Sequence, residues 1–258
     1  MSVQIKSARE INLMRKAGKI LEEVLKELQK SVRPGISTAD IDKLGEEVIR
    51  SYGCSPSFLG YNGYPASVCI SVNEEVVHGI PDRERIIKEG DIVSLDAGVI
   101  YKGYHADAAR TVAAGNISED AARLIKVTEE SFFEGIKYAR EGYCLYDISE
   151  AIGNYAERYG VVEELCGHGI GTKLHEDPQI PNFKMPRRGI RLKAGMTLAI
   201  EPMINQGTKK VKWLSDGWTV ITNDRKLSSH YENTVLITDG EPEILTLSEN
   251  PLKEEIIC

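Results

Sequence analysis

The sequence of 258 residues lacks any apolar run of membrane-spanning length, and its start, MSVQIKSARE, leads into a polar helix without the apolar segment of an export signal. It also lacks a basic excess, because 32 Lys and Arg face 39 Asp and Glu and the net charge is -7. Dedicated nucleic-acid binders carry the opposite balance. We therefore expect a cytoplasmic protein with no membrane association and no nucleic acid as a specific ligand.

Cysteine is sparse and shows no metal-binding or redox spacing. An odd count without a CxxC pair in an unexported chain argues against a disulfide framework. We expect reduced thiols, most of which pack as small core hydrophobes, at Cys54, Cys69, Cys144, Cys166 and Cys258. The hydrophobic content of 41% and the aromatic content of 7% are typical of an ordinary globular enzyme.

The first half of the chain predicts two helices followed by strands. Apolar residues recur at helical spacing over 11–28 and again over 41–48, the second run after the capping pair Ser37-Thr38. The period then changes to two, and segments 92–100 and 104–112 read as a hairpin.

The second half repeats this order. Helical stripes are followed by alternating strands, at 125–136, 145–155, 196–203, 218–222 and 230–238. The repetition of element order predicts an α+β fold with two pseudo-symmetric halves of about 1–115 and 116–258. Because no linker or low-complexity tract separates them at Gly115-Asn116, we interpret 1–258 as a single catalytic domain.

Asp96 and Asp107 stand on the two arms of the predicted hairpin. A symmetric turn at Lys102-Gly103 places Asp96 opposite Ala109. Asp107 is then two residues along from that partner and, by the period of two, on the same face. Diagonal neighbours have Cβ atoms roughly 7 Å apart, close enough for two carboxylates to share cations. The alternative makes Asp96 a turn acceptor and pairs Asp107 with Arg110.

Two glutamates lie at the ends of apolar strands. In MTLAIEPMI the alternation places Glu201 on the face of Thr197 and Ala199, whose small side chains leave space before it. Glu232 in HYENTVLIT begins an apolar strand in a similar way. The alternative for each is a glutamate of an edge strand that faces solvent.

His168 lies in CGHGIG, where three alternate glycines let the backbone pass close to a bound group. A phosphate-binding loop is the rival interpretation, but the GxGxxG spacing and a preceding βαβ unit are missing. His78 in VVHGIP and His175 in LHEDP are further candidates, although a lone histidine near a turn is more often structural.

Two more histidines are close to the acids in the sequence. By parity, His105 shares a strand face with Asp107, and His230 shares one with Glu232, where each could hydrogen-bond a metal ligand. His105 could equally face solvent.

Four carboxylates and one imidazole gathered in one place would carry about four negative charges, which two divalent ions would balance. This ligand chemistry suits manganese, iron(II), cobalt or zinc. Two such ions would generate a hydroxide at neutral pH and polarise a carbonyl oxygen, which is hydrolase chemistry. A Ser-His-Asp hydrolase lacks its GxSxG motif here, and a two-carboxylate glycosidase explains neither His168 nor the surplus acids.

Six motifs carry a resemblance to a known family, and in chain order they are VHGIP, IVSLDAG, YHADAARTV, GHGIG, LAIEP and HYENT. Over about residues 5–248 the sequence closely resembles type I methionine aminopeptidases of the short bacterial form, in the M24 metallopeptidase family. The resemblance implies the pita-bread fold, with two pseudo-symmetric halves around an antiparallel sheet and a dinuclear metal cleft. The implied activity is removal of the initiator methionine from nascent proteins when the second residue is small.

The resemblance also implies a role for each metal ligand. Asp107 and Glu232 would bridge two divalent ions, identified as cobalt, manganese, iron or zinc. Asp96 would chelate one ion, and His168 with Glu201 would complete the other. Glu201 is implied as the general base as well.

The implied substrate contacts lie beside these ligands. His175 would stabilise the oxyanion or hold the peptide carbonyl, and His78 would contact the backbone nitrogen of the substrate; a donor of this kind contributes about 10²-fold. The methionine pocket is implied at Phe58, Tyr61, Tyr64, Cys69 and Trp218. Phe58 stands where some relatives have cysteine, and Leu174 stands where many have an aromatic residue. These two residues are therefore expected to set how selective the pocket is for a methionine side chain. Asn62 replaces a histidine of some relatives and alters contact with the second substrate residue.

Two alternatives of the same fold remain. Prolidases and aminopeptidase P enzymes, which act on other peptides, normally carry a large N-terminal domain before the first ligand, and Asp96 comes early for that arrangement. Noncatalytic binding proteins of this fold usually lose ligands, whereas all five are present. We expect nascent polypeptide N-termini as partners, a transient ribosome contact and a monomer.

Overall fold

The structure, a computed structural model, describes residues 3–248. Over this range the helices are α1 (Ala8–Ser31), α2 (Thr38–Ser51), α3 (Glu119–Ile136) and α4 (Leu145–Tyr155). Each predicted helical stripe is confirmed. Ser37 caps α2 by accepting the backbone N–H of Asp40, as the capping signal predicts, and Ser7 caps α1 in the same way.

One large antiparallel sheet contains strands from both halves of the chain. Its strands are β1 (Ser55–Pro56), β2 (Val68–Val72), β4 (Ile92–Tyr101), β5 (Tyr104–Ala113), β7 (Gly167–Gly169), β8 (Glu176–Ile180), β9 (Thr197–Ile200), β14 (Glu232–Leu236) and β15 (Glu243–Ile244). The order is β1-β4-β5-β14-β9-β7-β8, while β2 pairs with β4 and β15 pairs with β14. The halves therefore meet where β5 pairs with β14.

Two small sheets and a short helix complete the framework. The small sheets contain β13 (Ser228–His230), β10 (Met203–Asn205) and β6 (Gly160–Val161), and β11 (Val211–Trp213), β12 (Val220–Thr222) and β3 (Glu75–Val77). A 3-10 turn, η1 (Tyr61–Gly63), lies before β2.

The hairpin of β4 and β5 has the predicted register. Tyr101 pairs with Tyr104 and Asp96 pairs with Ala109. The turn residues Lys102 and Gly103 both have positive φ, at 49° and 84°, which is the geometry of a tight two-residue hairpin loop. This turn fixes which side chains of β5 share a face with Asp96.

Two strands that the sequence predicts as continuous are interrupted. Segment 196–203 becomes β9 and β10, separated at Glu201 and Pro202, and segment 230–238 becomes β13 and β14, separated at Tyr231. Pro202 has no N–H to donate to a ladder, and its carbonyl accepts the N–H of Tyr231. At these breaks the chain passes between the large sheet and the small sheet that contains β10 and β13.

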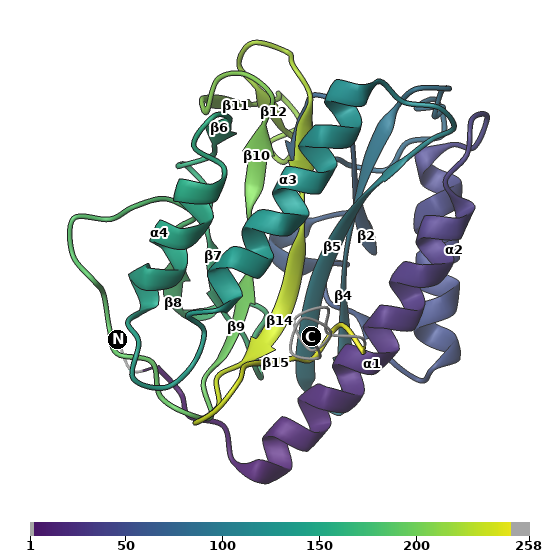
Figure 1. Ribbon diagram of the computed structural model, residues 1–258. Helices are drawn as coiled ribbons and strands as arrows, with labels where there is room; N and C mark the ends of the chain where they lie inside the picture. The colour runs from purple at the N-terminus through teal and green to yellow at the C-terminus, as the bar shows by residue number, and fades with distance from the viewer. Residues whose placement is uncertain (1–2, 249–258) are drawn as a thin grey trace, which may run out of the picture.

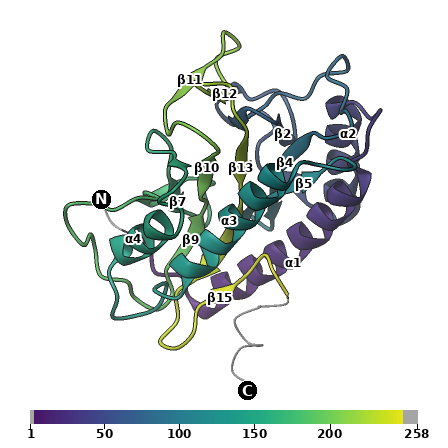
Figure 2. The ribbon, with the colours of Figure 1, turned by 45° about the horizontal axis from the view of Figure 1, so that its top comes forward.

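Helices cover the large sheet on the side that faces the reader in Figure 1, where α1 and α3 cross in front of β4, β5 and β14. The view in Figure 2 places α4 beside α3 over the second half. One apolar core joins α1 and α2 to the first-half strands, and another joins α3 and α4 to β9 and β14. Among residues 3–248, no helix is long and apolar enough to cross a membrane.

Four of the cysteines, Cys54, Cys69, Cys144 and Cys166, are free thiols, and the first three are buried as expected. Cys258 lies outside the described residues.

Candidate metal centre and substrate cavity

Strand pairing brings three of the predicted acids onto one face of the large sheet. Ala109 of β5 pairs with Asp96 of β4 on one side and with Glu232 of β14 on the other. Asp107 lies two residues from Ala109 along β5 and so points to the same face. All three carboxylates are buried, with exposed fractions of 8% or less.

His168 and Glu201 come from the neighbouring strands of the second half. His168 pairs with Ala199 of β9, and Glu201 directly follows that strand. Nε2 of His168 lies 3.6 Å from Oε1 of Glu201 and 3.8 Å from Oδ2 of Asp107. Ligand atoms of Asp107, His168 and Glu232 all lie within 4.8 Å of one another, a spacing that could hold a metal ion.

The acids are strongly perturbed by their burial. Burial raises the pKa of Asp96 to about 7. Burial also raises the pKa of Asp107, Glu201 and Glu232 well above the usual range, and the neighbouring carboxylates add to each shift. By contrast, burial lowers the pKa of His168 to about 3, so its imidazole is neutral and able to ligate.

Unpartnered polar atoms test whether a metal fits here. Asp96 Oδ1, Asp107 Oδ1 and Glu232 Oε1 are buried and have no hydrogen-bond partner among the described residues. Buried carboxylate oxygens are costly when they are left without partners. Oxygen donors together with one neutral imidazole are suitable ligands for borderline divalent ions, so the residues present fit a metal centre.

The alternatives for Asp107 and for Glu232 are wrong. Arg110 pairs with neither aspartate, because its guanidinium donates to the carbonyl of Glu232 at 2.6 Å and to Oδ1 of Asn233 at 2.7 Å. Glu232 does not face solvent at a sheet edge, because β14 lies between β5 and β9.

The glycines on either side of His168 allow neighbouring strands to pack closely against β7. The expectation from the sequence, that they make room for a bound group, is wrong. A Cβ at Gly167 would lie 2.4 Å from the carbonyl oxygen of Ala199, and one at Gly169 would lie 2.2 Å from that of Asp177. β9 and β8 are the strands that approach so closely. The glycines thus let β7 bring His168 near Glu201.

Two further imidazoles line the site. Nδ1 of His175 lies 2.7 Å from the hydroxyl of Tyr61, and its ring centroid is 4.2 Å from that of His168. His78 contacts Trp218 edge to face at 6.3 Å between centroids, and burial lowers its pKa to about 4. Both histidines line the cavity that the candidate metal ligands line, and neither lies at a remote turn.

His105 and His230 have different surroundings. His105 binds Oγ of Ser57 through Nδ1 at 3.0 Å and does not line the cavity. Nε2 of His230 lies 3.8 Å from Glu232 and 3.9 Å from Glu201, in a side chain that is 1% exposed. His230 therefore lies next to the carboxylates of Glu232 and Glu201 without lining the cavity, as expected from the strand face that it shares with Glu232.

All predicted site residues line one cavity of about 210 Å³. Its acidic end consists of the five candidate ligands, and its apolar wall is formed by Phe58, Tyr61, Tyr64, Cys69, Leu174 and Trp218. The wall is rigid, because Tyr64 packs edge to face on Trp218 and donates its hydroxyl to the carbonyl of Gly79 at 2.9 Å. The wall suits an apolar or thioether side chain next to the candidate metal centre.

A second cavity of about 560 Å³ meets the first at His168 and His175. Its other lining residues are Gln4, Cys166, Gly167, Lys173, Glu176, Asp177 and Gln179. Apart from His168 and His175, the polar side chains of this cavity were not predicted from the sequence, because isolated glutamines, lysines and acids carry no pattern.

Comparison with known proteins gives a consistent result. The family model described as metallopeptidase family M24 matches residues 12–239. A methionine aminopeptidase of Clostridium acetobutylicum is 56% identical over 247 residues, which cover 95% of this chain and 99% of the relative. A methionine aminopeptidase structure from Thermotoga maritima has a TM-score of 0.93 at 44% identity, with 95% of this chain and 99% of that chain covered.

A prolidase from Pyrococcus furiosus shares the fold alone. Its TM-score is 0.77 at 22% identity, and the match covers 95% of this chain and 66% of the prolidase. The pita-bread fold is therefore shared with a peptidase whose chain is longer than this one.

Proposed function

The chain belongs to metallopeptidase family M24, and we propose that it removes the initiator methionine from newly made proteins when the second residue is small. The observation that carries the proposal is the gathering of three buried carboxylates, the partly buried Glu201 and His168 at one end of an apolar cavity. A catalytic reading is favoured over a noncatalytic binding protein because no member of this ligand set is missing.

Asp96, Asp107, His168, Glu201 and Glu232 would hold two divalent ions, which when bound supply a nucleophile at neutral pH and polarise the peptide carbonyl. Glu201 is suited to accept a proton from the attacking water and to pass it to the leaving amine, because its carboxylate lines the cavity with Oε1 3.6 Å from Nε2 of His168. Cobalt, manganese, iron(II) and zinc all match the donor set.

His175 is suited to hold the carbonyl oxygen of the scissile bond. Burial lowers its pKa, so the ring is neutral and carries one proton. When the Tyr61 hydroxyl donates to Nδ1, that proton lies on Nε2 and can be donated to the developing oxyanion. His78, which lines the same cavity and packs edge to face on Trp218, would bind the backbone nitrogen of the substrate.

The apolar wall would bind the methionine side chain, with Cys69 and the aromatic rings contacting the thioether. The physiological substrate would be the N-terminus of a nascent chain, met in the cytoplasm by a monomer that contacts the ribosome transiently. The net charge of -7 fits a transient contact and not a tight one with nucleic acid.

The direct test is release of methionine from Met-Ala-Ser by protein loaded anaerobically with manganese, iron(II), cobalt or zinc. We expect release with at least one metal, and none from N-acetylated Met-Ala-Ser, because the free amine must enter the site. A panel of Met-X-Ser peptides should show the rate falling as X grows. No release with any of the four metals would favour the binding-protein alternative.

A further inference from the structure

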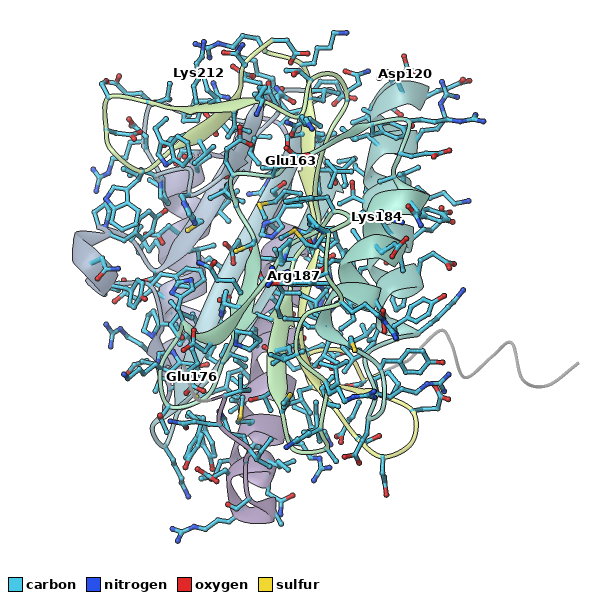
Figure 3. All side chains as sticks on the ribbon, turned by 90° about the vertical axis from the view of Figure 1, so that its left-hand side faces the viewer. Asp120, Glu163, Glu176, Lys184, Arg187 and Lys212 are labelled. Carbon is cyan, nitrogen blue, oxygen red and sulfur yellow. The ribbon has the colours of Figure 1, made fainter. Side chains whose placement is uncertain are left out.

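Lys6 and Glu176 form a buried ion pair beside the candidate site. Nζ of Lys6 lies 2.5 Å from Oε2 of Glu176, and the two side chains are only 3% and 8% exposed. Lys6 precedes α1, whereas Glu176 begins β8 directly after His175. The pair therefore joins the N-terminal segment to the residue next to a candidate substrate-binding imidazole. Glu176 is labelled in Figure 3, on the side of the molecule that is at the left of Figure 1.

Other contacts of the pair converge on the turn that precedes His175. Oε1 of Glu176 accepts the backbone N–H of Lys173 at 3.2 Å. A Cβ at Gly171 would lie 2.5 Å from Cε of Lys6 and 2.6 Å from Oε1 of Glu176, so the pair packs directly against the backbone of the turn. The carbonyl of Gly171 in turn accepts the N–H of His105 in β5 at 2.8 Å.

The backbone of Lys6 is anchored by a hydrogen bond to the second half of the chain. Its backbone N–H donates to the carbonyl of Gly195 at 2.8 Å, just before β9. The ammonium group therefore reaches the turn from a segment that is anchored to the sheet of the second half.

Stability alone does not account for this arrangement. The desolvation cost of a buried ion pair can exceed its attraction, and an apolar pair of similar volume is often as stable. What a directional charged hydrogen bond adds is a defined position for the carboxylate and for the residue beside it.

We propose that Lys6 is a positioning residue that fixes His175 through Glu176. The inference rests on the proposed function, in which His175 holds the scissile carbonyl. The His175 ring has little room to move, because its centroid lies 4.2 Å from that of His168 and its Nδ1 lies 2.7 Å from the Tyr61 hydroxyl. A displacement of about 1 Å in such a group can cost about 10²-fold in rate.

Three variants test the proposal: Lys6→Met, Glu176→Met and the double variant. Lys30→Met is the matched control, because Lys30 forms an exposed ion pair with Glu27 on α1. The single variants leave one charge buried without a partner and should lower Tm. The double variant should restore Tm, yet its kcat for Met-Ala-Ser should stay about 10- to 100-fold below wild type with KM changed less than about threefold.

A spectroscopic readout separates positioning from general stability. The chain contains five histidines, so the ring Cε1–H signals of the zinc-loaded protein can be assigned with His175→Ala. The His175 signal should move in the double variant and stay in place in Lys30→Met. A double variant with kcat within about twofold of wild type and an unmoved His175 signal would overturn the proposal. If wild type releases no methionine, the proposed function fails, while the His175 signal still tests the role of Lys6.

Discussion

Asp96 and Glu232 face the same residue, Ala109, from the two neighbours of β5. Asp96 belongs to the first half of the chain, and Glu232 belongs to the second. The pairing of β5 with β14 therefore assembles the candidate metal centre at the junction of the halves, and neither half alone holds all five ligands. This position couples metal binding to the pairing of the two halves.

Metal binding should accordingly stabilise the whole fold. Without counter-ions the buried carboxylates oppose one another, whereas an ion present at 100 times its Kd adds about 2.7 kcal/mol to the free energy of unfolding. We expect Tm to be lower after treatment with EDTA than after loading with manganese or zinc, as measured by calorimetry. An unchanged Tm would contradict a site shared by these residues.

The metal-free protein should also lose stability as the pH rises above neutrality. The folded-state pKa of Asp96 is raised to about 7, and those of Asp107, Glu201 and Glu232 are raised further by burial and mutual repulsion. Unfolded carboxyls titrate near pH 4. A raised carboxyl contributes its full stabilisation below that value and loses it as pH rises through the folded pKa.

The buried histidines act in the opposite sense. Burial lowers their pKa from 6.5 to about 4 or about 3, at His78, His105, His168 and His230. Each contributes stability above about pH 6.5 and loses it as pH falls through the folded pKa. The two sets therefore oppose each other between about pH 4 and 6.5, and of these two sets the carboxyls alone change the stability above that range.

Urea unfolding in EDTA from about pH 6.5 to 8 measures this effect, below the range in which cysteine thiols titrate. The free energy of unfolding should fall, by up to about 1.4 kcal/mol per pH unit for each carboxyl that is still protonated in the folded state. Protein saturated with manganese should not show the fall, because its carboxylates are already ionised. A flat profile in EDTA would mean that the acids are not buried together.

Asp107→Asn should abolish most activity. The amide offers one oxygen and no charge at a position 3.8 Å from Nε2 of His168. Mutation of a residue that only hydrogen-bonds a metal ligand typically lowers metal affinity or activity by about 10- to 100-fold. Loss of a ligand itself should therefore lower kcat/KM by about 10²-fold or more. Methionine release and metal content by mass spectrometry are the two measurements.

Glu119→Gln on α3 is the control for that variant, because the Glu119 side chain is 91% exposed and its ion pair within residues 3–248 is with Arg123 on the same helix. It should keep both activity and metal content. Equal loss in the two variants would point to a general defect in folding.

The hairpin register was accessible from the sequence because the turn residues and the alternation of β4 and β5 are local signals. The break at Pro202 had a local signal in the proline itself, whereas the break at Tyr231 had none, since it depends on pairing between β10, β13 and β6, which are distant in the chain. The tight packing of β7 against its neighbours was equally hidden, because a glycine does not reveal what approaches it.

The chemical role of each candidate ligand was predicted on different grounds from its position. Convergence of Asp96 and Asp107 followed from period and turn, whereas bridging, chelation and base roles came from the family resemblance. The Lys6 and Glu176 pair had no signal at all. A single lysine and a single glutamate, far apart in the chain, form no pattern until the fold brings them together.

Phe58→Ala should relax the selection of the first side chain. Phe58 is 8% exposed and lines the cavity of about 210 Å³, with Cε1 only 3.0 Å from the position of a Cβ at Gly98. Removing the ring enlarges the cavity, and each methylene that a pocket gains or loses changes discrimination by about 10- to 200-fold.

The ratio of kcat/KM for ethionine-Ala-Ser to that for Met-Ala-Ser should therefore rise by about tenfold or more. Leu59→Ala is the control, since Leu59 is 43% exposed and does not line the cavity. The variant should also unfold more easily, because truncating a buried phenylalanine costs about 3 to 5 kcal/mol. A lower Tm with an unchanged ratio would mean that Phe58 only supports the wall, and that the limit on side-chain size is set by Leu174.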